Sequence, residues 1–262
     1  MIQSLWTAAS GLLAQQTRVD TISNNLANVN TVGYKRDQAS FSDLVYARMR
    51  PDEQTTYLGQ SVPAGLDRGH GVRVNDIRKQ YSQGLLENTG RDLDLAIQGD
   101  GFFSVRLPDG TTGYTRNGEF RVDATGTVVT AAGYRLMAGN APVVIPDGST
   151  DLTVAEDGTI SVIDAGGNLV DIGQLNLTRF TDPSALTNAG DGVVLASPAA
   201  GTPVTVAPGT GTGVVQRALE RSNVDLAQEM VAMILAQRAY EMSSRAVQTA
   251  DQMIGLANNL RR

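Results

Sequence analysis

The sequence predicts an α+β protein with one long helix at each end of the chain and an antiparallel β domain between them. Three observations lead to this prediction. All nine prolines lie between Pro51 and Pro208, so both ends are free of this helix breaker. Apolar residues recur at helical spacing near both ends, and Gly-punctuated, Val- and Thr-rich runs fill the centre. We expect the helices to pack as a coiled coil around or below a β barrel or sandwich.

The first predicted helix covers residues 2–29, where an apolar stripe follows a seven-residue period. The stripe consists of Leu5, Leu12, Val19, Ile22 and Leu26. The helix should stop near Gly33, since Asn and Gly favour helix ends. Three asparagines lie close to this stop: Asn24, Asn25 and Asn28. They either satisfy backbone or neighbouring polar groups or simply terminate the helix, and the sequence leaves both interpretations open.

A polar stretch without clear periodicity follows at residues 46–74. Its landmarks are Tyr46, Pro51, Tyr57, Pro63 and Leu66. A connection of this length inside an ordered chain is either functional or disordered.

The centre of the chain has the pattern of short β-strands. Residues 93–97, 101–107, 126–130 and 159–163 are strand-like. Three dipeptides are hairpin-turn signals: Asp109-Gly110, Asn117-Gly118 and Asp157-Gly158. Short strands at this spacing predict an antiparallel barrel or sandwich.

The last predicted helix begins at Ser222, where Ser222-x-x-Asp225 resembles a capping box, and no Gly follows until Gly255. Its seven-residue stripe consists of Leu226, Met233, Tyr240, Val247 and Ile254. A seam of about five heptads argues for a coiled-coil partner, and the first helix is the nearest candidate. A plain helical hairpin within a monomer is the alternative.

Composition excludes several functions. The net charge is −6 and no basic tract occurs, so nucleic acid is not an expected partner. The chain has no Cys and one His, which excludes thiolate and two-histidine metal sites within one chain. No apolar run approaches the roughly 20 residues of a membrane span. The N-terminus lacks the regions of a standard secretory signal, so we expect a cytoplasmic protein or export without a cleaved signal.

The candidates for chemistry are weak. His70 has no nucleophile or acidic orienter that the sequence can name. Asp92 and Asp94 could share one strand face, but flanking polar positions of a half-buried strand look the same. The Gly-rich run 209–213 lacks the features of a phosphate loop. We therefore predict no enzymatic activity, no cofactor, no metal and no small-molecule substrate.

Six motifs, spread over almost the whole chain, resemble those of the bacterial flagellar rod and hook protein family. They are SNNLAN at 23–28, TVGYK at 31–35, QGDGFF at 98–103, YTRNGEF at 114–120, SNVDLAQE at 222–229 and QRAYE at 237–241. Within the family, the distal-rod members are the most similar. The opening MIQSLW, the QQT at 15–17, the length and the stretch 46–74, which resembles the distal-rod insertion, support this subtype.

The resemblance implies a structural subunit of a hollow helical shaft that transmits motor torque to the hook and lets exported subunits pass. It implies an N-terminal helix (1–35) and a C-terminal helix (214–262) in the inner layers of the tube. A connecting segment (36–75) and an outer β domain (76–213) lie between them. The stretch 46–74 would stiffen the shaft, and the helix stripes and Asn24, Asn25 and Asn28 would carry self-assembly.

The implied partners are further copies of the chain, proximal rod proteins below, the hook protein above, the surrounding outer rings and the flagellar type III export apparatus. The implied location is the basal body, spanning the periplasm toward the outer membrane. A hook or proximal-rod paralogue is one alternative function. A soluble β-rich binding domain with a helical oligomerisation hairpin is an alternative from another class.

Overall fold

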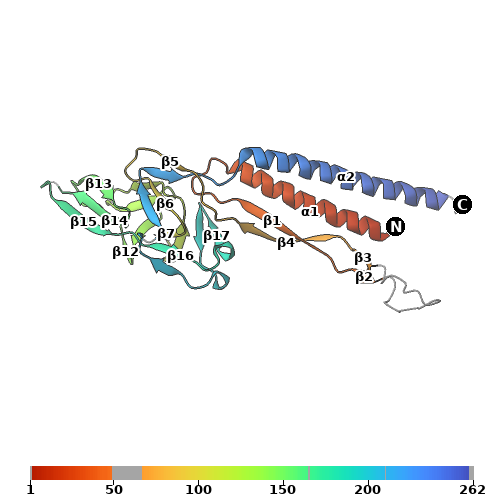
Figure 1. Ribbon diagram of the computed structural model, residues 1–262, viewed down its shortest axis with the longest axis horizontal. Coiled ribbons are helices and arrows are strands. Elements are labelled where there is room, and N and C mark those ends of the chain that lie inside the picture. Colours follow the sequence, from red (N-terminus) through yellow and green to blue (C-terminus); the bar gives the residue numbers. More distant parts are fainter. Residues whose placement is uncertain (1, 49–66, 165, 210, 260–262) are drawn as a thin grey trace. The chain divides into compact units, whose positions relative to one another are not determined.

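The computed structural model describes residues 2–48, 67–164, 166–209 and 211–259, and they form two compact units (Figure 1). The helical unit draws on residues 1–26, 37–78 and 226–262, and the β unit on residues 27–36 and 79–225. Both units are therefore built from segments far apart in the sequence. Helices at both ends of the chain and an antiparallel β region confirm the predicted α+β class.

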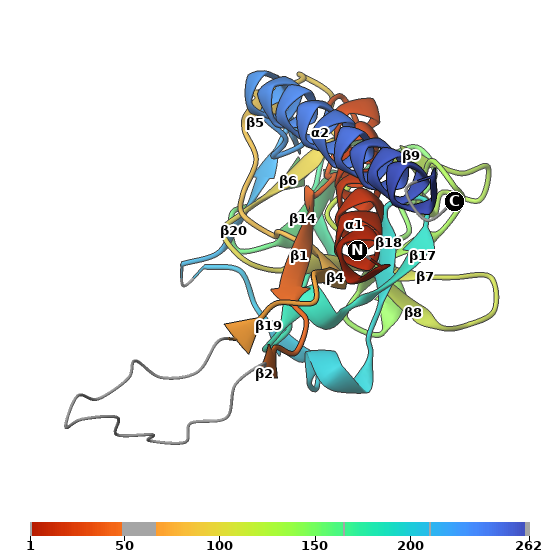
Figure 2. The same cartoon turned by 90° about the vertical axis from the view of Figure 1, so that its right-hand side faces the viewer.

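In the helical unit, α1 (Ile2–Ala27) and α2 (Leu226–Asn259) run side by side (Figures 1 and 2). An antiparallel ribbon of β1 (Asp37–Asp43) and β4 (Val72–Lys79) follows α1, and β2 (Ala47–Arg48) pairs with β3 (Asp67–Arg68). The Val72 backbone N–H donates to Ser10 Oγ at 3.3 Å, which ties the ribbon to α1. The prediction for α1 is right to within two residues at its C-terminal end.

The predicted start of α2 at Ser222 is wrong, because the helix begins at Leu226. Ser222 Oγ accepts from the backbone N–H of Val224 at 3.3 Å, within a local turn. Asn223 is bonded to Arg36 and Gln80 of the β unit, so these residues precede the helix rather than form its first turn.

Small side chains line the contact between the two helices. Ala14 of α1 and Ala236 and Ala250 of α2 are buried, and Ile22 is the large buried apolar residue of α1. A Cβ placed on Gly11 would lie 3.8 Å from Ser243 Oγ. Small residues at such positions let two helix backbones approach closely, which fits the alanine-rich stripe of α2.

The strands of the β unit are short, and every pairing that the structure defines is antiparallel. They are β5 (Leu86–Asn88), β6 (Leu95–Gln98), β7 (Phe102–Arg106), β8 (Thr112–Thr115), β9 (Phe120–Val122), β10 (Val128–Thr130), β11 (Arg135–Ala138), β12 (Ala141–Pro142), β13 (Thr150–Val154), β14 (Thr159–Ile163), β15 (Leu169–Gln174), β16 (Leu177–Arg179), β17 (Thr187–Gly190), β18 (Val193–Leu195), β19 (Val204–Val206), β20 (Gly213–Gln216) and β21 (Ala218–Glu220). Single turns of 3₁₀ helix occur at Pro183–Ala185 and Pro198–Ala200.

In the described part of the chain, the largest sheet follows the order β17-β18-β8-β7-β11-β10-β9, with β12 beside β11 and with β16 joining β7 to β19. A second sheet contains β13, β14 and β15. The two-stranded pairs β20–β6 and β21–β5 join the last strands of the unit to its first ones. The β unit is therefore completed only by residues 213–220.

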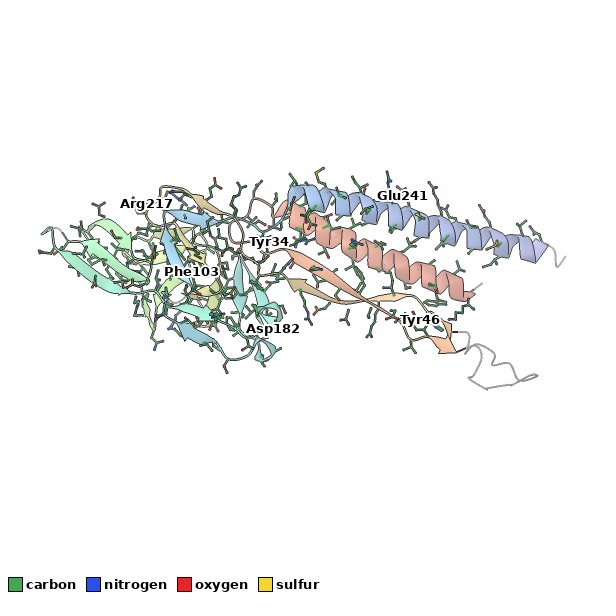
Figure 3. All side chains as sticks on the ribbon, in the orientation of Figure 1. Tyr34, Tyr46, Phe103, Asp182, Arg217 and Glu241 are labelled. Atoms are coloured by element: carbon green, nitrogen blue, oxygen red, sulfur yellow. The ribbon has the colours of Figure 1, made fainter. Side chains whose placement is uncertain are left out.

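One hydrophobic core joins the large sheet to the β13–β15 sheet. Phe103 and Leu177 from the large sheet pack in the same cluster as Ile160 from β14 and Val214 from β20. Phe103, labelled in Figure 3, lies in the β unit. It meets Phe120 edge to face, with ring centroids 5.4 Å apart. A smaller aromatic cluster surrounds Phe102 on the opposite side of β7, as strand alternation requires.

Two of the three predicted hairpin turns are confirmed. Asp109-Gly110 joins the paired strands β7 and β8, and Asp157-Gly158 joins β13 and β14. The prediction for Asn117-Gly118 is wrong, because β8 pairs with β7 and β18 while β9 pairs with β10. Gly118 serves close packing instead, since a Cβ there would overlap the carbonyl oxygen of Leu95.

Candidate functional site

Helix α2 carries apolar side chains on two faces. The face turned toward the interior of the helical unit includes Ala236 and Ala250, with Met233 and Val247 half-buried beside them. The large apolar residues that remain exposed are Leu226, Met230, Val231, Ile234, Leu235, Tyr240, Met242, Met253 and Leu256. At about 100° per residue, Val231 and Ile234 point well away from Ala236. An exposed apolar face of this kind marks a protein interaction surface.

The predicted assembly stripes are divided between interior and surface. On α1, Ile22 is buried and Leu5, Leu12, Val19 and Leu26 are half-buried. On α2, Met233, Val247 and Ile254 are half-buried, whereas Leu226 and Tyr240 are exposed. Sequence reasoning missed Trp6 and Leu13 of α1, whose side chains are 72% and 66% exposed. The sequence signal for both was an apolar residue in a helix that lies outside the seven-residue stripe, which indicates a second apolar face.

The asparagines at the end of α1 bond within the chain. The side chain of Asn25 is buried and makes a reciprocal pair with Asp37, because Nδ2 donates to the Asp37 carbonyl and Oδ1 accepts from its N–H, each at 2.8 Å. Asn24 Nδ2 donates to the Asp37 carboxylate at 3.1 Å. Asn28 Oδ1 accepts from the Thr31 hydroxyl at 3.1 Å. Asn24 and Asn25 thus fix where β1 begins relative to the end of α1.

The predicted stiffening segment is described only at its edges. Tyr46 is exposed, and its ring lies 3.5 Å from the position that a Cβ of Gly69 would take (Figure 3). Pro51, Tyr57, Pro63 and Leu66 lie outside the described residues.

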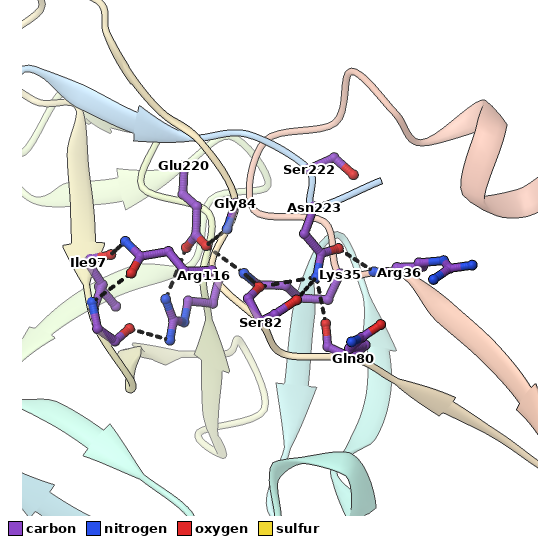
Figure 4. Close-up of polar contacts among 12 residues, drawn as sticks. Lys35, Arg36, Gln80, Ser82, Gly84, Ile97, Arg116, Glu220, Ser222 and Asn223 are labelled. Carbon is purple, nitrogen blue, oxygen red and sulfur yellow. Dashed lines mark hydrogen bonds and ion pairs between the residues drawn. The ribbon is translucent and has the colours of Figure 1, made fainter. Parts of the chain in front are cut away.

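A buried ionic cluster in the β unit joins four parts of the sequence (Figure 4). We call it the junction cluster, and it consists of Lys35, Ser82, Arg116, Glu220 and Asn223. The Glu220 carboxylate is fully buried, with Oε1 2.5 Å from Lys35 Nζ and Oε2 3.0 Å from Arg116 Nη1. The Gly84 backbone N–H donates to Oε1 at 2.8 Å. Both carboxylate oxygens are therefore occupied by charged or backbone donors.

Each cation of the cluster has a further acceptor. Lys35 Nζ donates to the Ser82 carbonyl and Arg116 Nη2 to the Gly99 carbonyl, both at 2.8 Å. Burial lowers the pKa of Lys35 below its ordinary value, because loss of water outweighs the attraction of Glu220. Breaking one partner of such a cluster is costly, since it leaves an uncompensated buried charge.

Sequence reasoning found only part of this cluster. Lys35 and Arg116 belong to the TVGYK and YTRNGEF motifs, but Glu220 was not singled out. A carboxylate at the end of the short apolar strand Ala218–Glu220 was the available signal.

Asp92 and Asp94, the candidates for acid–base chemistry, both form ion pairs with arginines. Asp94 is buried and accepts from Arg91 at 2.7 and 2.9 Å, and Asp92 lies in a turn with Arg217 Nε 2.6 Å away. Among the described residues, no three His, Cys, Asp or Glu side chains gather as metal ligands would. No helix in the described ranges has the length and apolar content needed to cross a membrane.

Three family models match the chain. The model "Flagella basal body rod protein" matches residues 5–35, "Flagellar hook protein FlgE/F/G D1 domain" matches residues 96–162, and "Flagellar basal body rod FlgEFG protein C-terminal" matches residues 215–260. Each matched range contributes one charged residue of the junction cluster.

The chain is also similar along its whole length to characterised proteins. It is 40% identical to the flagellar basal-body rod protein FlgG of Borreliella burgdorferi, with all of both chains covered. It is 44% identical to FlgG of Buchnera aphidicola from Schizaphis graminum, over 97% of this chain and 98% of the relative. FlgG of Bacillus subtilis is 37% identical, again over the full length of both chains.

Proposed function

Because this chain belongs to the FlgG-type family of flagellar basal-body rod proteins, and is thus a structural subunit of the distal rod, we propose how its surfaces build that rod. Copies of the chain assemble through α1 and α2 into a hollow helical shaft. The shaft carries torque from the motor to the hook and leaves a central channel for exported subunits. A helical polymer needs a heterologous interface that does not close into a ring.

The exposed apolar face of α2 is the observation that carries this proposal. Val231, Ile234 and Leu235 are between 50% and 58% exposed on a helix whose other face is covered by its own chain. Burying them against a neighbouring copy would remove apolar surface from water, which is favourable by about 25 cal/mol per Å². The helices of neighbouring copies would then form the coiled coil that the heptad spacing predicts.

The domain roles follow from this arrangement. Helices α1 and α2, the helical parts of the predicted segments 1–35 and 214–262, form the inner layers of the tube, and residues 36–75 connect them to the β region. Residues 76–213, together with β20 and β21, lie outside as a sandwich of the large sheet and the β13–β15 sheet. Proximal rod proteins bind below, the hook protein above, and the outer rings surround the shaft. The subunits reach the periplasm through the flagellar type III apparatus without a cleaved signal.

Leu226→Asp tests the assembly face. Leu226 is exposed within its own chain, so the substitution should leave the fold intact and block polymerisation by forcing an unpaired carboxylate into the interface. Leu169→Asp, which makes the same substitution at an exposed leucine of the β unit, away from α2, is the matched control. Electron microscopy of basal bodies from cells carrying each variant should show truncated rods for Leu226→Asp only. Full-length rods with Leu226→Asp would contradict the assembly face.

A further inference from the structure

The chain crosses from one unit to the other at four points in the sequence, after residues 26, 36, 78 and 225. On the β-unit side of the last three points lie Arg36, Gln80 and Asn223, and all three belong to or contact the junction cluster. The backbone at these segments carries a load on the helical part of the chain directly into the β unit. The way in which the segments are fastened therefore determines how the β unit takes up that load.

We propose that the junction cluster is a mechanical clamp that ties three of these chain segments into one anchored body, so that a load on any of them is shared by all. The three segments are residues 31–36, 79–85 and 217–223. This inference rests on the proposed torque-bearing function and adds the place where a subunit resists the load.

Asn223 makes the first set of ties. Its Oδ1 accepts from the Arg36 N–H at 2.8 Å, and its Nδ2 lies 2.8 Å from the Gln80 carbonyl, 3.1 Å from the Ser82 carbonyl and 2.9 Å from Ser82 Oγ (Figure 4). The carbonyl acceptors fix which atom of the amide is nitrogen. One side chain thus holds all three segments.

Glu220 and Lys35 make the second set of ties. Lys35 Nζ joins the Glu220 carboxylate to the Ser82 carbonyl, and the Glu220 carboxylate also accepts from the Gly84 N–H. The backbone adds direct bonds, from the Gly33 N–H to the Glu220 carbonyl and from the Gln80 N–H to the Arg36 carbonyl, each at 2.8 Å.

Each pair of segments is therefore bonded directly, and no segment can leave without breaking bonds to both others. Arg116 ties the clamp to the body of the β unit, since it directly follows β8 and contacts Glu220 Oε2, the carboxylate oxygen that Lys35 does not use. The ties to the carboxylate are charge-assisted and buried, so they are stronger than neutral bonds in water.

Hydrogen exchange on the purified full-length chain tests the clamp, with Glu220→Gln and Asn223→Ala as variants. The reporters are amides bonded within the clamp but not to the altered side chain. They are those of Arg36 and Gln80 for Glu220→Gln, and those of Gly33, Gly84 and Arg221 for Asn223→Ala. We expect the reporters of all three segments to lose protection together. The loss should be about tenfold or more for Glu220→Gln, which removes bonds to a charged group, and about threefold or more for Asn223→Ala, whose bonds are neutral.

Arg179→Gln is the matched control, since it removes an exposed ion pair with Asp100 in the same unit but outside the three segments, and should leave all five reporters unchanged. Loss confined to one segment would overturn the clamp. If Glu220→Gln prevents folding, Asn223→Ala still decides the matter, because it leaves the buried charges paired.

A load test separates the clamp from the proposed assembly. Cells carrying Asn223→Ala should build rods of normal length, yet lose rotation speed or shed filaments more often than wild type as the viscosity of the medium rises. Wild-type behaviour at high viscosity would overturn the mechanical role. The exchange experiment uses the unassembled chain, so its result stands whether or not the α2 face proves to be the assembly surface.

Discussion

At the scale of single residues, Gly33 explains why the turn after α1 has its sequence. It adopts a φ of +69°, and a Cβ there would lie 2.6 Å from the Asn117 nitrogen and 2.7 Å from the Arg116 carbonyl carbon. The turn therefore needs both a left-handed conformation and close approach to the backbone of a second motif. This close approach brings Lys35, two residues after Gly33, near Arg116, and both side chains pair with the Glu220 carboxylate.

Gly33→Ala should destabilise the β unit strongly. The left-handed conformation costs about 1–2 kcal/mol for Ala, and the backbone clash adds a cost of roughly 1–3 kcal/mol from forced shifts. Gly90→Ala is the matched control, because Gly90 has nearly the same φ of +72° with nothing within 4 Å of its would-be Cβ. Urea unfolding should show a larger loss for Gly33→Ala than for Gly90→Ala. Equal losses would mean that the clash is relieved.

Asp109 provides a prediction on pH. Hydrogen bonds from the Thr111 hydroxyl at 2.7 Å and the Thr111 N–H at 2.9 Å lower the pKa of Asp109 below its ordinary value of 3.8. Since the folded-state pKa is depressed, the stabilisation is fully present above pH 3.8 and is lost as pH falls through the folded value. In Thr111→Val, NMR titration should show the pKa of Asp109 moving up toward 3.8, with that of Asp157 unchanged. An unmoved Asp109 would assign the shift to the backbone donor.

At the scale of elements, the helices were predictable because their apolar period is long and uninterrupted. The strands were only partly predictable. Run 159–163 coincides with β14, but β5 and β21 are three residues each and owe their existence to their pairing with each other. Asn117-Gly118 misled because a turn dipeptide describes local backbone shape and not which strands it joins. Glu220 could not be identified from local sequence either, because its partners Lys35 and Arg116 lie far away in sequence.

Ala236→Leu should show how closely α1 and α2 pack. Ala236 is 1% exposed, so extra methyl groups must push the helices apart or leave their rotamers, at a cost of about 1–3 kcal/mol. Ala246→Leu makes the same change at an exposed position of α2 and should be nearly neutral. Thermal unfolding followed by circular dichroism compares the two. Equal midpoints would show that the helix contact yields without strain.

At the scale of the whole molecule, the segment 46–74 should control stiffness rather than assembly. Its removal should leave α1, α2 and the β unit able to form and polymerise, but give a rod that is more flexible or is curved like a hook. Cryo-electron microscopy of rods from cells carrying the deletion measures this directly. A deletion rod as straight and stiff as wild type would refute the stiffening role.

Deleting the gene should reveal which part of the rod this protein forms. We expect basal bodies with truncated rods and neither hook nor filament, with the stopping point marking where this subunit begins. A complete rod lacking only the hook would instead indicate a hook protein. The rod should be restored by the wild-type gene supplied in trans.

The late position of Glu220 also has a kinetic consequence. Its bond to Lys35 joins residues 185 positions apart, and β6 and β5 find their partners only in β20 and β21. Contacts of such high sequence separation form slowly, because the loop-closure entropy is lost before they stabilise anything. A chain emerging from its N-terminus has no Glu220 carboxylate to pair with Lys35 or Arg116 until most of the chain is out. Because the β unit needs β20, β21 and Glu220 to complete its fold, it cannot finish folding until these last residues have emerged, and a partly emerged chain keeps the flexibility of an unfolded one.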